Sequence, residues 1–241
     1  MYHFDSRIRY SETDENGQLS LTGILNYLQD CTTFQSEDMK RGIPFLWDMH
    51  KVWMLAGWQV LIDKRPALGD NVSIFTWPYD FKGIYGLRNF KVTEKAGKTA
   101  EEADRPIIRA NAVWFLYDLQ SGRPCRIPEE VSSAYQLEEK LAMEYAPRRI
   151  PLPEPMEAGR ELIIGRHQLD SNHHVNNARY VELAAEYLPS GTEVREIRAE
   201  YKRAALLGDR ICPRALLTQD SLTVSLQDAE GEPYANVYFR L

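Results

Sequence analysis

The sequence has few cysteines and no recognisable pattern for holding a metal. Only three cysteines occur in 241 residues, and Cys31, Cys125 and Cys212 lie far apart without a C-x-x-C pair. This odd, scattered set argues against a disulfide framework and against a structural zinc site. His173 and His174 are adjacent, but neighbouring side chains point in different directions and rarely bind one ion. We therefore expect neither a metal nor a cofactor.

Long apolar runs and an excess of basic residues are also absent. No apolar stretch approaches the roughly 18–20 residues that a membrane-spanning helix needs, and residues 1–7 lack the layout of a signal or transit peptide. We expect a cytoplasmic protein with no membrane span. The net charge of −6 argues against nucleic-acid binding, which requires a basic face. No G-x-S-x-G, P-loop or G-x-G-x-x-G pattern occurs, which removes the α/β-hydrolase and nucleotide-binding classes.

The sequence does contain one pattern of elements that occurs twice. Apolar residues at helical spacing predict a helix that begins at Leu21, with Ser20 as its N-cap. Residues 96–98 predict a hairpin turn, and a second helix is predicted around 180–188. Predicted strands or extended segments rich in β-branched and aromatic residues accompany both helices, at 2–10, 53–62, 71–78, 85–93, 107–119, 161–167, 193–201, 210–217, 221–227 and 234–241.

Two short sequences recur in the same order in the two halves. DENGQL at 14–19 matches DSNHHV at 170–175, and KRPALGD at 64–70 matches KRAALLGD at 202–209 with one inserted residue. The period is far longer than that of a solenoid, so the repeat predicts a duplicated domain. Each copy combines one helix with a run of antiparallel strands, which predicts the α+β class.

The segment between the two copies changes character. It is charged and carries four prolines within nine residues, which resist both helix and sheet, and it shows only one weak helical stretch at 131–145. We expect an N-terminal domain over residues 1–130, a linker over 131–158 and a C-terminal domain over 159–241.

A carboxylate, an amide and an imidazole lie close together before the second helix. Asp170 and His174 could activate a water or attack an acyl carbon, while Asn172 could orient the water or hold a carbonyl oxygen. The N–H groups of the helix's first turn could stabilise an oxyanion. A structural interpretation stays open, because an aspartate before a helix is often only a cap, a role that Asn176 or Asn177 could also fill.

The first copy of this motif differs at one informative position. It keeps Asp14 and Asn16 but has Gln18 where the second copy has His174. Glutamine is neither an acid nor a base at neutral pH, so we expect the second copy to be active and the first to be structural. A second site at Asp14 remains an alternative, because residues 12–17 also resemble the acid-before-glycine motif of single-domain hotdog acyl-CoA thioesterases.

The stretch LDSNHHVNNARY at 169–180 resembles the D-x-N-x-H-V-N-N-x-x-Y signature of acyl-ACP thioesterases. Further matches in the family's order are TWP at 76–78, IRANAVW at 108–114, PEEV at 128–131 and EYKR at 200–203. The resemblance implies a tandem, or double, hotdog fold, in which each antiparallel sheet wraps around one long helix. It also implies hydrolysis of fatty acyl-ACP to free fatty acid and holo-ACP, which terminates fatty acid synthesis.

The same resemblance implies that Asp170, Asn172 and His174 are the catalytic residues and that acyl carrier protein is the partner. The family's Glu-Cys pair is replaced here by Ala204-Ala205, and Cys212 is a poor substitute. This departure favours Asp170 as base or nucleophile, with His174 transferring a proton. An acidic carrier would require local basic residues, for which the candidates are Arg148, Arg149, Lys202, Arg203, Arg210 and Arg214.

Three alternatives remain open at the level of the sequence. An acyl-CoA thioesterase would differ only in the carrier of the acyl chain. A non-catalytic acyl-binding hotdog protein is favoured by the missing Glu-Cys pair and opposed by the complete D-x-N-x-H set. A hotdog dehydratase would need a second histidine near the Asp14 motif, where none occurs. Either a monomer or a homodimer is compatible with a chain that already contains two copies.

Overall fold

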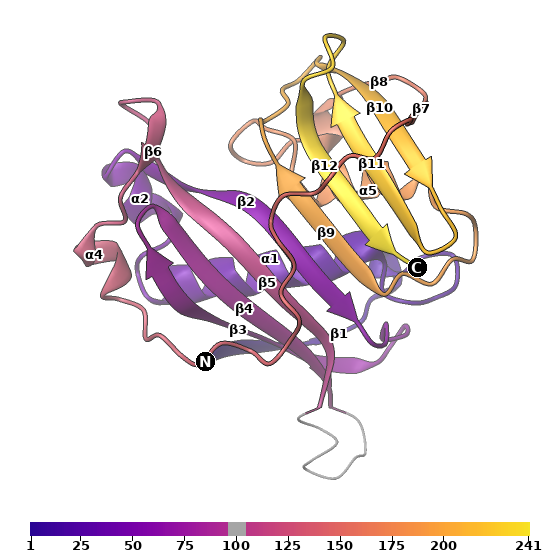
Figure 1. Cartoon of the computed structure of the whole chain (residues 1–241). Helices are drawn as coiled ribbons and strands as arrows, with labels where there is room; N and C mark the ends of the chain where they lie inside the picture. The colour runs from indigo at the N-terminus through magenta and orange to yellow at the C-terminus, as the bar shows by residue number, and fades with distance from the viewer. Residues whose placement is uncertain (96–104) are drawn as a thin grey trace. The chain divides into compact units, whose positions relative to one another are not determined.

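The computed structural model describes residues 1–95 and 105–241 and divides them into two compact units (Figure 1). The first unit comprises residues 1–56 and 62–145, and the second comprises residues 57–61 and 146–241. The hairpin turn predicted at residues 96–98 lies outside the described residues. Among the described residues, none of the helices combines the length and the apolar character that crossing a membrane requires.

The first unit is an antiparallel sheet with one long helix against it. Its strands follow the order β1-β3-β4-β5-β2, and β6 pairs with β5. The elements are β1 (Tyr2–Arg7), η1 (Tyr10–Glu12), α1 (Leu21–Asp38), α2 (Ile43–Asp48), β2 (Lys51–Ile62), β3 (Asn71–Lys82), β4 (Tyr85–Glu94), β5 (Pro106–Asp118), β6 (Arg123–Cys125) and α4 (Glu129–Ser132).

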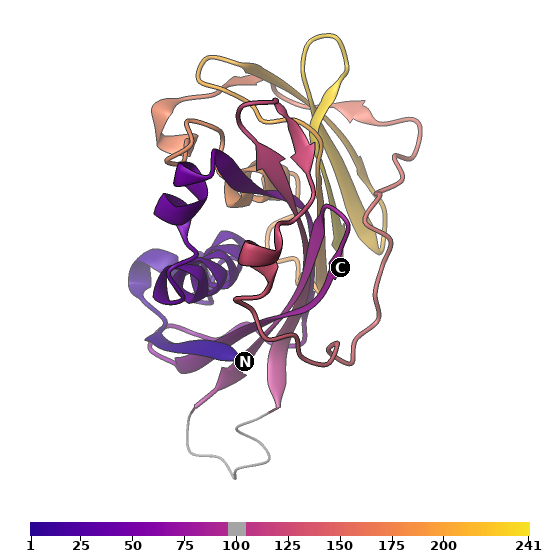
Figure 2. The same ribbon diagram turned by 90° about the vertical axis from the view of Figure 1, so that its left-hand side faces the viewer.

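Helix α1 begins where the sequence predicts, because Ser20 caps it. The N–H of Gly23 donates to the Ser20 hydroxyl at 3.0 Å. Figures 1 and 2 show α1 lying across one face of the sheet. Its buried side includes Leu28 and Cys31, and the Cys31 thiol donates to the carbonyl oxygen of Ile74 in β3 at 3.4 Å. The apolar stripe read from the sequence is therefore the face that packs on the sheet.

The second unit repeats this arrangement with a shorter helix. Its strands follow the order β9-β12-β11-β10-β7, with β8 also on β10 and with Gly57–Leu61 of β2 on the other side of β9. The elements are β7 (Glu157–Ala158), β8 (Leu162–Ile163), η2 (Arg166–Gln168), α5 (Asn177–Ala185), β9 (Glu196–Tyr201), β10 (Arg210–Leu217), β11 (Ser221–Gln227) and β12 (Pro233–Arg240). Helix α5 packs on β11 and β12, and its Val181 and Ala184 are fully buried.

Both units therefore confirm the predicted α+β class, and the predicted strands at 210–217 and 221–227 have the observed bounds. Two local predictions are wrong. The helix predicted at 131–145 is limited to α4, which ends at Ser132. The strand predicted at 161–167 is only two residues long, and the 3-10 helix η2 follows it.

Buried polar side chains explain why residues 138–145 follow a fixed path without regular structure. Asn89 of β4 is fully buried, and its Oδ1 accepts hydrogen bonds from the Leu141 N–H at 3.0 Å and the Tyr145 hydroxyl at 2.9 Å. The indole N–H of Trp77 donates to the carbonyl oxygen of Glu139 at 2.8 Å. Side chains of the sheet thus supply the partners that a helix would otherwise give this backbone.

The second unit holds the following residues in the same way. The Ala146 N–H donates to Oε1 of Gln59 at 2.9 Å, and the Ile150 N–H donates to Oε2 of Glu200 at 3.1 Å. Residues 131–145 thus cluster with the first unit and residues 146–158 with the second. The domain bounds proposed from the sequence, with a linker over 131–158, stay a prediction.

Candidate active site

The candidate catalytic residues lie in one tight turn. Oδ1 of Asp170 accepts hydrogen bonds from the N–H groups of Asn172 at 2.8 Å and His174 at 3.4 Å. The Asp170 N–H donates to the carbonyl oxygen of His174 at 2.8 Å, which closes the turn. His173 adopts a φ of 62°, a left-handed conformation that residues with a side chain seldom take. The turn therefore brings Asp170, Asn172 and His174 together.

The side chains of this turn are accessible to a bound molecule. Asp170 and His174 are half-buried and Asn172 is exposed. Within residues 1–95 and 105–241, no hydrogen bond joins the three side chains to one another, and no donor contacts Oδ2 of Asp170. One carboxylate oxygen thus stabilises the turn while the other is available for chemistry.

Asn176, rather than Asp170, caps the helix. Its Oδ1 accepts from the Ala178 N–H at 2.9 Å, and its carbonyl oxygen accepts from the Arg179 N–H at 2.9 Å. The sequence-based alternative that Asn176 serves as the cap is confirmed. Because these two N–H groups already have acceptors, they are poor candidates for stabilising an oxyanion. Asn172 is the better candidate for holding a carbonyl oxygen.

The first copy of the motif forms the same turn. Oδ1 of Asp14 accepts from the N–H groups of Asn16 at 2.9 Å and Gln18 at 3.1 Å. The Asp14 N–H donates to the Gln18 carbonyl oxygen at 2.8 Å, and Gly17 has a φ of 71°, close to that of His173. The duplication predicted from the letters therefore extends to individual hydrogen bonds.

Hydrogen bonds also set the register of the second repeated stretch. The Leu19 N–H donates to the Pro66 carbonyl oxygen at 2.8 Å, and the Val175 N–H donates to the Ala205 carbonyl oxygen at 2.9 Å. Pro66 and Ala205 are therefore equivalent. Upstream, the N–H groups of residues 63 and 64 both donate to the carbonyl oxygen of Ile107. In the same way, the N–H groups of residues 202 and 203 both donate to the carbonyl oxygen of Tyr234. The inserted residue predicted from the letters is thus wrong, and the copies align without a gap.

In this register, Ala204 of the second copy is the residue equivalent to Arg65 of the first. Nη1 of Arg65 forms an ion pair with Oδ2 of Asp14, and both side chains are largely buried. Burial acts to raise the pKa of Asp14, but the Arg65 bond and the N–H bonds from Gln18 and Asn16 lower it overall. Asp14 is therefore neutralised by a cation, whereas an uncharged methyl group stands at the equivalent position of the second copy. This contrast supports the expectation that the first copy is structural.

No cysteine replaces the family's missing thiol. Ala205 is fully buried, and Cys212 lies on β10. Burial and the nearby Glu161 carboxylate raise the pKa of the Cys212 thiol, which disfavours the reactive thiolate. In the described ranges, no three His, Cys, Asp or Glu side chains gather as a metal site would require.

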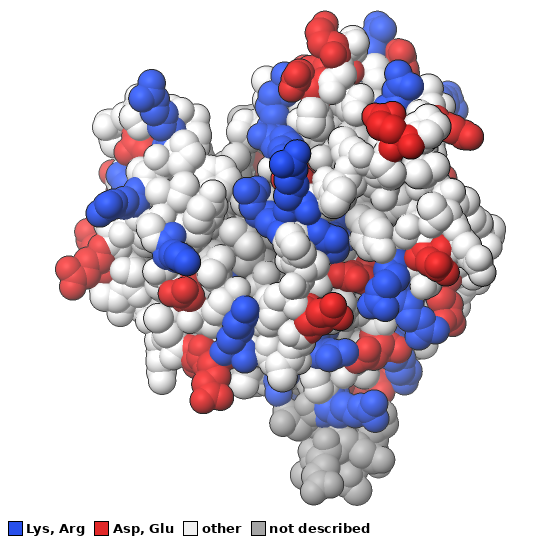
Figure 3. Space-filling model, in the orientation of Figure 1, with Lys and Arg blue, Asp and Glu red and all other residues white. Residues whose placement is uncertain are grey.

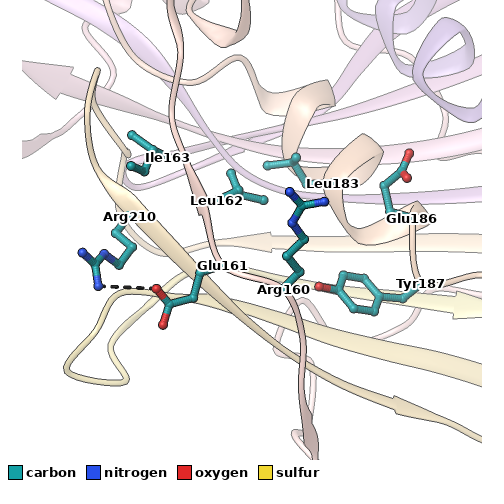
Figure 4. Close-up of a pocket in the computed structure, with 8 residues that line it drawn as sticks. All are labelled: Arg160, Glu161, Leu162, Ile163, Leu183, Glu186, Tyr187 and Arg210. Atoms are coloured by element: carbon teal, nitrogen blue, oxygen red, sulfur yellow. Dashed lines mark hydrogen bonds and ion pairs between the residues drawn. The ribbon is translucent and has the colours of Figure 1, made fainter.

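An open pocket of about 710 Å³ lies in the second unit between β8, α5 and β10 (Figure 4). Leu162, Ile163 and Leu183 form its apolar part. Arg210 points to Glu161 at its edge, with 3.4 Å between Nη1 and Oε2. Neither the Asp170 turn nor any of its side chains lines this pocket. The pocket therefore adds no group to the candidate catalytic set.

The predicted basic residues differ in how far they are already engaged. Lys202 pairs with Glu200 at 2.6 Å and Arg203 with Asp228 at 2.5 Å. Figure 3 shows basic side chains gathered where residues 146–150 cross the sheet of the second unit, and Arg148 and Arg149 there are both exposed.

Sequence reasoning missed Arg198 in this group. Its Nη2 donates to the carbonyl oxygens of Pro147 at 2.5 Å and Arg149 at 3.1 Å. A basic residue on the polar face of β9 was the available signal.

Residues 1–135 match the family model of the acyl-ACP thioesterase N-terminal domain, and residues 157–233 match that of its C-terminal domain. The chain belongs to the acyl-ACP thioesterase family. Over 250 residues it is 25% identical to a chloroplastic acyl-[acyl-carrier-protein] hydrolase of Cuphea viscosissima, covering 97% of this chain and 57% of that protein. The family member thus spans only about half the length of the curated relatives that it matches.

Two solved structures show the fold. An acyl-ACP thioesterase from Bacteroides thetaiotaomicron superposes with a TM-score of 0.87 at 21% identity, covering 99% of this chain and 96% of that one. The 12:0-ACP thioesterase from Umbellularia californica gives a TM-score of 0.83 at 18% identity, with the same coverage of 99% and 96%. The double hotdog fold implied by the resemblance is confirmed.

The ion pair of the first copy predicts a pH-dependent contribution to stability. Because the pKa of Asp14 is lowered in the folded state, Arg65→Ala should lower the free energy of unfolding at neutral pH, by about 1–2 kcal/mol. The loss should shrink as the pH falls through the lowered pKa, where Asp14 becomes protonated. Urea unfolding at several pH values measures it. Arg195→Ala, which removes an exposed ion pair with Glu193, is the control. A loss independent of pH would assign Arg65 to packing alone.

Proposed function

We propose that this chain hydrolyses fatty acyl-ACP to free fatty acid and holo-ACP. The observation that carries the proposal is the contrast between the two copies of one turn. Oδ2 of Asp14 is bound by Arg65, whereas no donor among the described residues contacts Oδ2 of Asp170, which shares its turn with a histidine. Membership of the acyl-ACP thioesterase family and the activity named for the relatives support the substrate class.

In the proposed reaction, Asp170 activates a water or attacks the acyl carbon directly. Along the water route, Oδ2 of Asp170 accepts a proton as the water oxygen bonds to the acyl carbon, and the carbon–sulfur bond then breaks. His174 delivers a proton to the departing pantetheine thiolate, and the proton that Asp170 accepted then returns to His174 through solvent, which restores both groups. Asn172 holds the thioester carbonyl oxygen, whose negative charge grows in the transition state.

The biological setting follows from the same proposal. Release of the free acid would end fatty acid synthesis on the carrier, and acyl carrier protein would be the macromolecular partner. A cytoplasmic location and a monomeric or homodimeric state stay predictions, and the curated relatives are named as chloroplastic proteins.

Release of free thiol from acyl-ACP and acyl-CoA of graded chain length tests the activity. Turnover should be higher with acyl-ACP, and Asp170→Asn and His174→Ala should each lower kcat by about 10²–10⁴-fold. Asparagine at 170 keeps an oxygen acceptor for the turn, so the fold should survive, which circular dichroism checks. Asp14→Asn and Gln18→Ala are the matched controls from the first copy and should keep the wild-type kcat.

Each opposing result has a distinct meaning. Higher turnover with acyl-CoA would make the chain an acyl-CoA thioesterase. Well-folded protein without turnover on either carrier would favour an acyl-binding protein. Full activity in both Asp170→Asn and His174→Ala would remove the site assignment.

Ala204 offers a test of the open carboxylate oxygen. Ala204→Arg reproduces the cation of the first copy and should pair with Asp170, which would lower kcat by at least about a hundredfold. Ala204→Gln is the control, since it adds a polar side chain of intermediate size without the positive charge. An equal loss in both variants would mean that bulk at position 204, rather than neutralisation of Asp170, blocks the reaction.

The exposed arginines of residues 146–150 predict a salt-dependent carrier interaction. Reversing the charge with Arg148→Glu and Arg149→Glu together should raise KM for acyl-ACP about tenfold at low salt, with little change in kcat. The effect should fade as salt screens the charges, and KM for the neutral substrate acyl-pantetheine should not change. Arg123→Glu with Arg126→Glu, a reversal of two exposed arginines in the first unit, is the control. Equal effects of the two pairs would reject a specific docking surface.

A further inference from the structure

Tyr180 connects helix α5 to the segment beside the Asp170 turn. Its side chain is only 2% exposed, and its hydroxyl oxygen accepts a hydrogen bond from the Ala205 N–H at 2.8 Å. The carbonyl oxygen of the same alanine accepts from the Val175 N–H at 2.9 Å, directly after His174. The phenol therefore holds the backbone of Ala205, whose carbonyl oxygen in turn holds the end of the candidate catalytic turn.

The first copy satisfies the same position without a hydroxyl. Its helix carries the buried Ile24 at the position of Tyr180, counted from the aspartate of each turn. Pro66 stands where the second copy has Ala205, and proline has no N–H to satisfy. The two copies thus differ as matched pairs, because an isoleucine goes with a proline and a tyrosine with an alanine. A fully buried Ala205 N–H would be costly without its acceptor.

A second tyrosine fixes the position of this phenol. The rings of Tyr180 and Tyr201 pack with centroids 5.8 Å apart at 60°, and the Tyr201 hydroxyl donates to the Asn177 carbonyl oxygen at 2.9 Å. Burial raises the pKa of Tyr180 to about 12, and the Asp170 carboxylate adds to that rise. The phenol is therefore neutral at physiological pH and lies within the electrostatic range of Asp170.

We infer that Tyr180 is a positioning residue, whose hydroxyl holds the Ala205 backbone and thereby fixes the Asp170–His174 turn against α5. The inference rests on the proposed function of that turn. The Tyr180 hydroxyl thus constrains position 205 of the second copy, as the proline ring constrains position 66 of the first.

Tyr180→Phe tests the inference by removing one oxygen and keeping the ring. We expect kcat to fall about tenfold, the equivalent of one buried hydrogen bond, while KM stays within about twofold. Adding Ala205→Pro removes the N–H that lost its acceptor and keeps the carbonyl that binds Val175. The double variant should therefore return kcat to within about threefold of the wild type.

Tyr201→Phe is the matched control, because it removes a neighbouring tyrosine hydroxyl that bonds to α5 instead. Its effect should not be relieved by Ala205→Pro. An unchanged kcat in Tyr180→Phe, or a loss that Ala205→Pro relieves equally in both backgrounds, would overturn the inference.

Hydrogen exchange at the Val175 amide gives a readout independent of turnover. Exchange should accelerate in Tyr180→Phe and return towards the wild-type rate in the double variant. If the wild type proves inactive yet this pattern holds, the proposed function fails while the positioning of the turn by Tyr180 stands. Exchange that is unchanged in Tyr180→Phe would overturn the positioning itself.

Discussion

A carboxylate oxygen that accepts two main-chain N–H groups organises both copies of the central turn. Asp14 and Asp170 each use Oδ1 in this way, so each turn is closed before any ligand binds. A charged acceptor makes such bonds stronger than neutral ones, which suits a short loop that begins a helix. The arrangement commits one oxygen to structure, and the role of each copy then depends on what contacts the other oxygen.

Two substitutions at equivalent positions separate the copies. Arg65 neutralises Asp14, whereas Ala204 leaves Asp170 without a cation, and Gln18 stands where His174 supplies an ionisable ring. Neither substitution changes the backbone of the turn, whose hydrogen bonds are the same in both. The two copies thus share one backbone arrangement and differ at the second carboxylate oxygen, which is held in an ion pair in Asp14 and contacts no donor among the described residues in Asp170.

The sequence predicted those features that depend on local pattern. Ser20 and the apolar stripe behind it marked the start of α1, and alternating β-branched residues located most strands. The path of residues 138–145 depends instead on a hydrogen bond to the side chain of Asn89. This residue is distant in the sequence, and no local pattern marks its role. Matching residue types in the sequence likewise aligned Arg65 with Arg203 instead of Ala204. The true register is set by main-chain hydrogen bonds, which do not depend on residue type.

The ungapped register changes the meaning of the departure from the family pattern. Position 204 is equivalent to position 65 of the first copy, where Arg65 contacts the aspartate of the turn. A side chain at position 204 would therefore be well placed to act on Asp170. Its replacement by alanine removes a polar group from the site without disturbing the turn, which keeps all its hydrogen bonds. In the proposed reaction, activation of water then depends on Asp170 and His174. Their placement depends in turn on the Ala205 backbone, which the Tyr180 hydroxyl holds.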